Sequence, residues 1–238
     1  MQKSVIEYLN KTAAAFPTKI AVHDEKEEIT FSQLKQNATY LAKVIEKFVD
    51  AREPVGVYIP KGCKMITAFA AINMSANFYI PLDTKSPTQR VVSILSTLEA
   101  KIVVTDRAHK ETLSSFFSWE ILVFEECLEG INNEVSELRY ENEQIDTDPV
   151  YSIFTSGSTG TPIGVVVSHR GVIDYIDWAI ETFNIDSSSV IGNQAPFYFD
   201  NSTLDIYLMY STGAMLNIIP EINFAFPAKL IDYLNEQK

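Results

Sequence analysis

Hydrophobic residues along the first half of the chain follow two different spacings. In some segments they recur every three or four residues, which places them on one face of a helix. In others they form short continuous runs, which are typical of buried strands. The spacing predicts helices over 5–16, from 30 or 32 to 48, from about 63 and from 87, and strands at 20–23, 28–30, 55–59, 78–80, 101–105 and 120–124. Strands that alternate with helices form βαβ units, so we expect an α/β fold with mostly parallel sheets flanked by helices.

The second half repeats this alternation after an acidic and weakly periodic segment, residues 129–149. We expect that segment to be an exposed connection with an edge strand at 137–140. Beyond it, the pattern predicts strands at 150–155, 165–168, 190–193 and 214–219, and helices at 169–183, 201–210 and 228–235. The connection would divide the chain into a first α/β subdomain, residues 1–128, and a second, residues 150–238.

Composition and charge narrow the classes of function. The chain has 238 residues, of which 46% are hydrophobic and 21% charged, so it can bury a core of ordinary globular size. Its formal net charge is −12. An acidic surface repels phosphate backbones and anionic lipid, which argues against nucleic-acid binding and membrane-surface binding. A small anion held by backbone N–H groups would escape this repulsion.

The cysteines and the chain start give no sign of a metal site or of export. Cys63 and Cys127 are far apart, with no CxxC pair and no neighbouring histidine. We expect both to be reduced thiols of a cytoplasmic protein. Residues 1–10 lack the apolar core of a signal peptide. The most apolar stretch, residues 65–82, is interrupted by polar residues and fits a helix followed by a strand rather than a membrane span.

The densest chemical signal is the segment 155–164, which reads Thr-Ser-Gly-Ser-Thr-Gly-Thr-Pro-Ile-Gly. Its glycines allow the backbone to approach a ligand closely, and its hydroxyl groups add hydrogen-bond donors, so the segment can wrap a phosphate group. Neither the Walker pattern nor the dinucleotide fingerprint fits these residues. Taken alone, they also fit a Ser/Gly-rich hairpin turn between two strands.

Further motifs accompany this segment in a fixed order. Tyr79-Ile-Pro-Leu-Asp83, with Pro87 and Arg90, precedes it, and Val167-Ser-His-Arg-Gly171 and Phe199-Asp-Asn-Ser-Thr-Leu-Asp205 follow it. Together these motifs resemble those of the adenylate-forming, or AMP-binding, enzymes, and residues 151–165 resemble their phosphate loop. Residues 197–207 are most similar to D-alanine–carrier protein ligases, with the adenylation domains of nonribosomal peptide synthetases as near neighbours. The resemblance implies the fold of the large N-terminal domain of these enzymes.

The resemblance also implies a reaction and a set of binding residues. A carboxylate would attack the α-phosphate of ATP to give an acyl-adenylate and pyrophosphate, and a carrier-protein thiol would then take the acyl group. The residues that would hold the ATP phosphates are Thr155, Ser156, Gly157, Ser158, Thr159 and Gly160. Asp200 would pair with the α-ammonium group of an amino-acid substrate, and the ligand of Mg²⁺ is expected outside this chain. On its own, Asp200 also fits a carboxylate at the start of a helix, where the helix dipole favours it.

Two departures from the family pattern affect these expectations. The loop carries Ile163 where a lysine is usual, and Met74-Ser-Ala76 stands where Lys-Ala-Gly is usual. The missing ammonium group removes a cation beside the phosphates, which weakens the expected binding of ATP.

The later family motifs and the small C-terminal domain, with its catalytic lysine, are expected outside these 238 residues. We therefore expect the chain alone to be nearly inactive, with no catalytic residue of its own. The alternatives are a short nucleotide-binding or protein-interaction relic without turnover, and part of an acyl-CoA synthetase. The latter would have no use for the carboxylate of Asp200.

Two expectations concern other side chains with possible chemistry. His169 opens a helix just after the loop, and we expect it to be a hydrogen-bonded structural residue. Tyr175, Trp178 and Phe183 recur at helical spacing, and we expect them in the core rather than on a base-stacking surface.

Overall fold

The computed structural model describes residues 2–118, 120–129, 137–140, 143–156 and 162–236. Its strands are β1 (Ile20–His23), β2 (Glu28–Thr30), β3 (Pro54–Tyr58), β4 (Phe78–Pro81), β5 (Ile102–Thr105), β6 (Glu120–Val123), β7 (Pro149–Ser156), β8 (Pro162–Ser168), β9 (Val190–Asn193) and β10 (Met215–Ile218). Its helices are α1 (Val5–Ala15), α2 (Phe31–Ile45), α3 (Cys63–Met74), α4 (Thr88–Thr97), α5 (Lys110–Ser114), α6 (Phe124–Glu129), α7 (His169–Phe183), α8 (Asn201–Thr212), α9 (Glu221–Phe224) and α10 (Pro227–Glu236).

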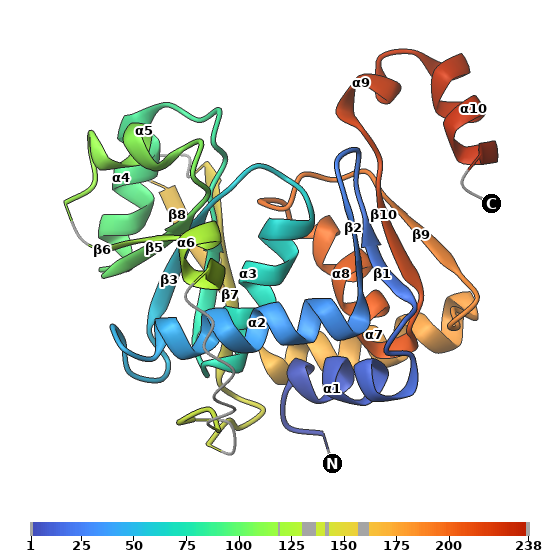
Figure 1. The fold of residues 1–238 in the computed structure, drawn as a ribbon, viewed down its shortest axis with the longest axis horizontal. Coiled ribbons are helices and arrows are strands. Elements are labelled where there is room, and N and C mark those ends of the chain that lie inside the picture. Colours follow the sequence, from blue (N-terminus) through green and yellow to red (C-terminus); the bar gives the residue numbers. More distant parts are fainter. Residues whose placement is uncertain (1, 119, 130–136, 141–142, 157–161, 237–238) are drawn as a thin grey trace.

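The described strands form two sheets (Figure 1). The larger sheet has the order β6-β5-β3-β4-β7-β8, and the smaller has the order β2-β1-β10-β9. Neighbouring strands are parallel except in the β1–β2 and β7–β8 pairs. The α/β fold with mostly parallel sheets flanked by helices is therefore confirmed. No helix in the described part of the chain is both long and apolar enough to cross a bilayer.

Two of the predicted helices show why the sequence folds locally as it does. Helix α2 begins after Thr30, whose hydroxyl accepts from the N–H of Gln33 while the Gln33 side chain accepts from the N–H of Thr30. This capping box satisfies two backbone donors that have no partner within the helix. Helix α3 lies between the two sheets (Figure 1), and every residue of it except Lys64 is buried. Such a position explains why its apolar residues occupy all faces.

Each sheet contains strands from both sides of the acidic connection. The early strands β1 and β2 lie beside β10 and β9, and the later strands β7 and β8 extend the sheet of β3 to β6. One hydrophobic cluster contains side chains from both sheets and from the helices between them. The division into residues 1–128 and 150–238 therefore does not follow the sheets.

The predicted edge strand at 137–140 is wrong. Residues 139 and 140 form a turn, because the N–H groups of Arg139 and Tyr140 donate to the carboxylate of Glu46 instead of to a neighbouring strand. The connection is also less exposed than expected, since Tyr140, Gln144 and Asp148 are buried. Residues 130–136 and 141–142 lie outside the described residues.

The expectation that the aromatic residues of α7 belong to the core is also wrong. Tyr175, Trp178 and Phe183 are 42%, 53% and 53% exposed. Helix α7 instead buries a different face, which carries Val172, Ile173, Ile176 and Ala179. Both faces repeat at helical spacing, so the spacing alone could not tell which of them packs inward.

Candidate functional site

The predicted phosphate loop connects two antiparallel strands at the edge of the larger sheet. Thr155 at the end of β7 pairs with Ile163 of β8, and Ser156 pairs with Pro162. The predicted binding residues Gly157, Ser158, Thr159 and Gly160 lie outside the described residues. Thr155 is exposed, and its hydroxyl faces the carbonyl oxygen of Ile163 at 3.5 Å. The loop thus joins two strands that are paired antiparallel up to Ser156 and Pro162.

The last glycine of the motif has a packing role. A Cβ atom at Gly164 would lie 2.8 Å from the ring of Phe154 and 2.9 Å from the hydroxyl of Ser152. Gly164 is therefore needed for the close approach of β8 to β7. Its neighbour Ile163, which stands where the family usually has lysine, is 55% exposed. An exposed position does not require an apolar side chain for packing.

Asp200 occupies the N-cap position of α8, at the end of a loop that starts after β9. Its side chain is exposed and makes no capping hydrogen bond. The backbone holds it in place, since the carbonyl of Asp200 accepts from both the N–H and the hydroxyl of Thr203, at 2.9 and 2.6 Å. The carboxylate therefore lies at the helix start, as the dipole interpretation expects, and is accessible to a cation.

A contact between β7 and α8 brings the two predicted groups onto adjoining elements. The hydroxyl of Tyr151, four residues before Thr155, lies beside the side chain of Thr203, three residues after Asp200. Burial raises the pKa of Tyr151, and the nearby carboxylate of Asp200 raises it further. Four residues of strand span roughly 13 Å. Thr155 thus lies roughly 13 Å along the strand from Tyr151, and Asp200 lies about one helical turn from Thr203.

The earliest motif packs against the same helix. Tyr79 of β4 is buried, stacks on Phe69 with ring centroids 4.0 Å apart, and shares a 2.9 Å hydrogen bond with the hydroxyl of Tyr207. Tyr207 lies on α8, at the end of the segment 197–207 that is most similar to D-alanine–carrier protein ligases. The first motif is therefore in direct contact with this segment through two buried tyrosines.

A pocket of about 370 Å³ opens at the carboxyl ends of β3, β4 and β10, where ligands of parallel sheets commonly bind. Its wall includes Lys61, Asp83, Phe197, Tyr198 and Glu221. Thr155 and Asp200 are not among the described residues that line it. The pocket therefore lies beside the predicted binding residues rather than around them.

Lys61 is the residue of this pocket that sequence reasoning missed. Its ammonium group donates to the carbonyls of Asn193 and Gln194, at 3.3 and 3.2 Å, and lies 5.6 Å from the ring centroid of Phe197. Burial lowers the pKa of Lys61 to about 8. No carboxylate lies within ion-pair distance of it in the described part of the chain. A lysine between proline and glycine looks like a surface loop residue, so no local signal marks it.

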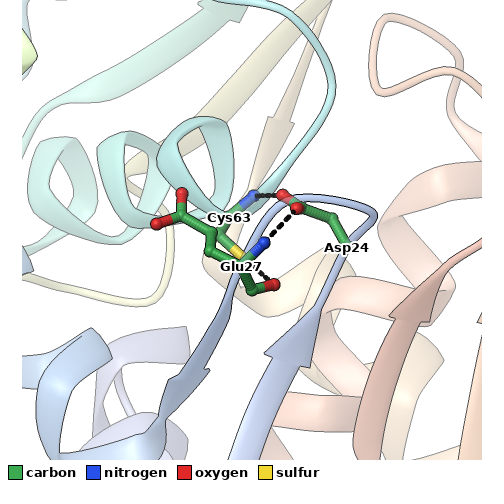
Figure 2. A group of neighbouring side chains, drawn as sticks. All are labelled: Asp24, Glu27 and Cys63. Carbon is green, nitrogen blue, oxygen red and sulfur yellow. Dashed lines mark hydrogen bonds between the residues drawn. The ribbon is translucent and has the colours of Figure 1, made fainter.

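A second group at the pocket wall, Asp24, Glu27 and Cys63, has potential metal ligands within 4.8 Å of one another (Figure 2). The Asp24 carboxylate and the Cys63 thiol already have partners. The carboxylate of Asp24 accepts from the N–H groups of Lys26, Glu27 and Cys63, and the thiol of Cys63 points to the carbonyls of Val22 and Glu27. Burial and the neighbouring Asp24 raise the pKa of Cys63, so its thiol stays protonated. The group fastens the β1–β2 turn to the start of α3, and its chemistry does not favour a metal ion.

His169, at the start of α7, has the structural role that its position predicted. It is 2% exposed, and its Nδ1 accepts from the N–H of Val5 at 3.2 Å. Burial lowers the pKa of His169 to about 4, against the smaller opposing effect of Asp148 and other carboxylates. The ring is thus neutral at pH 7 and joins α1 to α7.

Comparison with known proteins gives a consistent family. The family model described as "AMP-binding enzyme" matches residues 9–238. The D-alanine--D-alanyl carrier protein ligase of Lacticaseibacillus rhamnosus is 29% identical over 93% of this chain and 43% of its own length. The ligase of the same name from Bacillus cereus (strain B4264) is 32% identical over 98% of this chain and 46% of its own length. The chain thus spans less than half the length of these relatives.

Solved structures agree on the fold. The nonribosomal peptide synthetase FmoA3 (S1046A) covers 98% of this chain with a TM-score of 0.87 and 24% identity, over 24% of its own chain. Its form with bound alpha-methyl-L-serine-AMP covers 96% of this chain with a TM-score of 0.85 and 25% identity, over 25% of that chain. The arrangement of sheets and helices described above is therefore also found in a nonribosomal peptide synthetase.

Proposed function

Because this chain belongs to the family of AMP-binding enzymes, we propose that it is part of an amino-acid-activating ligase. The ligase forms an aminoacyl-adenylate from ATP, with D-alanine as the best candidate substrate, and passes the aminoacyl group to the thiol of a carrier protein. The names of the matched relatives support both the substrate and the partner. The observation that carries the proposal is the position of Tyr79, which contacts the ring of Tyr151 and the hydroxyl of Tyr207. It thereby joins the strand that leads to the loop to the helix that starts at Asp200.

In this proposal the chain binds and orients ATP and the amino acid, and the catalytic lysine belongs to another part of the protein. The loop from Thr155 to Gly160 holds the phosphates of ATP with backbone and hydroxyl donors. Asp200 binds the α-ammonium group, for which its exposed carboxylate is a suitable partner. We assign the Mg²⁺ ligand to residues outside these 238, and we expect the chain alone to form no adenylate above background.

The amino-acid assignment is tested by a pair of ligands that differ in one group. D-alanyl sulfamoyladenosine and propionyl sulfamoyladenosine are non-hydrolysable adenylate analogues, and only the first has an α-ammonium group. We expect the chain to bind the D-alanyl analogue about 10- to 100-fold more tightly, as one charge-assisted hydrogen bond allows. Ligand-observed NMR titration measures both affinities, even when binding is weak.

The matched variant is Asp200→Asn, which keeps the shape of the side chain and removes its charge. It should bind both analogues equally, with the affinity that the unchanged chain shows for the propionyl analogue. Because Asp200 makes no capping hydrogen bond, the variant should fold normally. Equal binding of both analogues by the unchanged chain would contradict the amino-acid assignment and favour an acyl-CoA synthetase instead.

A further inference from the structure

Lys61 connects the larger sheet to the loop that ends at Asp200. It follows β3, in the larger sheet, whereas its hydrogen-bond partners Asn193 and Gln194 lie at the end of β9, in the smaller one. The ammonium group thus spans the two sheets where both present the carboxyl ends of their strands. An ammonium group can donate to several carbonyls at once, and a buried one that is otherwise unsatisfied is costly.

The first half of the loop from Gln194 to Asp200 is held in place by Lys61 and by buried side chains of the loop and of the preceding strand β9. Phe197, which is 2% exposed, lies under the ammonium group and contacts Phe69 edge-on, with centroids 6.0 Å apart. Asn193, which is fully buried, donates from its side-chain amide to the carboxylate of Asp205 on α8 at 2.8 Å. Lys61 therefore fixes the loop at its first residues and at Phe197, three residues before Asp200.

The outer half of the loop is held by local backbone hydrogen bonds. Phe199 is 54% exposed, its N–H donates to the carbonyl of Pro196, and its own carbonyl accepts from Ser202. The hydrogen bonds of Asp200 in the described part of the chain run through its backbone carbonyl to the first turn of α8. The direction of the Asp200 carboxylate is consequently set by where the buried half of the loop places the start of α8. A displacement of a substrate-positioning group by about 1 Å can lower the reaction rate by up to about 100-fold.

We propose that Lys61 is a positioning residue, which holds the loop 194–200 so that Asp200 meets the ammonium group of the substrate. This inference rests on the proposed function, because it requires that Asp200 binds that group. Lys61 itself does not touch the substrate in this proposal. Its effect on binding is therefore specific for the amino-acid end of the ligand and absent for ligands without an ammonium group.

The test compares Lys61→Met, Lys61→Arg and the control Lys101→Met. Methionine keeps the length of the side chain without donors, and arginine restores a cation that can donate to two carbonyls. Lys101 is paired with Glu53 at 3.1 Å and lies outside the pocket wall, so Lys101→Met removes an ion pair elsewhere on the surface. Hydrogen exchange of the backbone reports on the loop, and NMR titration with the two sulfamoyladenosines reports on binding.

We expect Lys61→Met to speed up exchange in residues 194–200 by at least tenfold. It should also lower the preference for the D-alanyl over the propionyl analogue by about tenfold, with the affinity for the propionyl analogue unchanged. Lys61→Arg should restore most of the preference, and Lys101→Met should leave both readouts as they are. If Lys61 only stabilised the fold, Lys61→Met would lower the affinities for the D-alanyl and the propionyl analogue by the same factor.

Two results would overturn the inference. One is loop exchange in Lys61→Met equal to that of the unchanged chain, and the other is faster exchange with an intact preference for the D-alanyl analogue. Failure of the proposed function is visible separately, because the unchanged chain would then show no preference at all. In that case Lys61 has no substrate group to serve, and the inference fails with the function.

Discussion

At the scale of single residues, the feature that departs most clearly from the family pattern is Ile163. Its side chain is 55% exposed on β8, directly opposite Thr155 at the foot of the loop. Replacing it by lysine should therefore cost little packing energy and should place an ammonium group near the bound phosphates. A charge-assisted contact to phosphate contributes about 1.5–3 kcal/mol. We expect Ile163→Lys to increase the affinity for ATP by about tenfold or more, measured by NMR titration at low salt.

The control for that variant is Val165→Lys. Val165 is 52% exposed and lies two residues further along the same face of β8, so the variant adds the same charge about 7 Å from position 163. An equal gain of ATP affinity in both variants would show a general effect of the added charge, and would contradict a specific lysine position at 163.

At the scale of elements, His169 makes the packing of α1 against α7 sensitive to pH. Its folded-state pKa of about 4 lies below the value near 6.5 that is expected in the unfolded chain. The unfolded chain therefore binds a proton first as the pH falls, so the stabilisation is complete above pH 6.5 and is lost between pH 6.5 and 4. The loss between pH 7 and pH 5 should be about 2 kcal/mol in the free energy of unfolding.

Urea unfolding at the two pH values measures this loss. His169→Gln, whose side-chain oxygen can still accept from the N–H of Val5, should be less stable at pH 7 but should show a pH difference smaller by about 2 kcal/mol. The same pH difference in both proteins would mean that other groups, such as surface carboxylates, cause it.

At the scale of the whole molecule, the shared sheets predict that the chain does not separate into two stable halves. Residues 1–188 retain β1 and β2 but lose β9, β10 and the buried face of α8. A two-stranded ribbon is marginally stable on its own. Residues 1–188 keep the whole larger sheet, so we expect them to unfold less cooperatively and at a clearly lower temperature than the full chain in circular dichroism.

The matched truncation ends at residue 226 and removes α10, which projects at the C-terminal end of the chain and has no buried residue (Figure 1). Its hydrogen bond to the smaller sheet, from the hydroxyl of Tyr233 to the side chain of Asn217 at 2.7 Å, is lost with it. The truncated chain should keep a cooperative transition within a few degrees of that of the full chain. A cooperative transition of residues 1–188 at the same temperature would show that the early strands fold without β9 and β10.

The local elements and the family motifs could be predicted from the chain alone. Apolar spacing predicted α7 at its observed bounds, and residue type left Thr30 or Ser32 as the cap of α2, of which the structure has Thr30. Both predictions depend only on neighbouring residues. The order of the motifs, including Asp200, identified the family for the same reason, since a motif is a local string. The roles of Thr155 to Gly160 and of Asp200 stay predictions until the titrations above are made.

Which local patterns meet became visible in the folded chain alone. Folding exposed Trp178 and buried the opposite face of α7, it placed β1 beside β10, and it brought Tyr79 into contact with Tyr207. It also brought Lys61 to the carbonyls of Asn193 and Gln194, more than 100 residues away. Periodicity gives the spacing of a face but not its neighbour, and a hydrogen bond between distant loops leaves no trace in either loop. The positioning of Asp200 is therefore a property of the folded chain, whereas its chemistry is a property of the sequence.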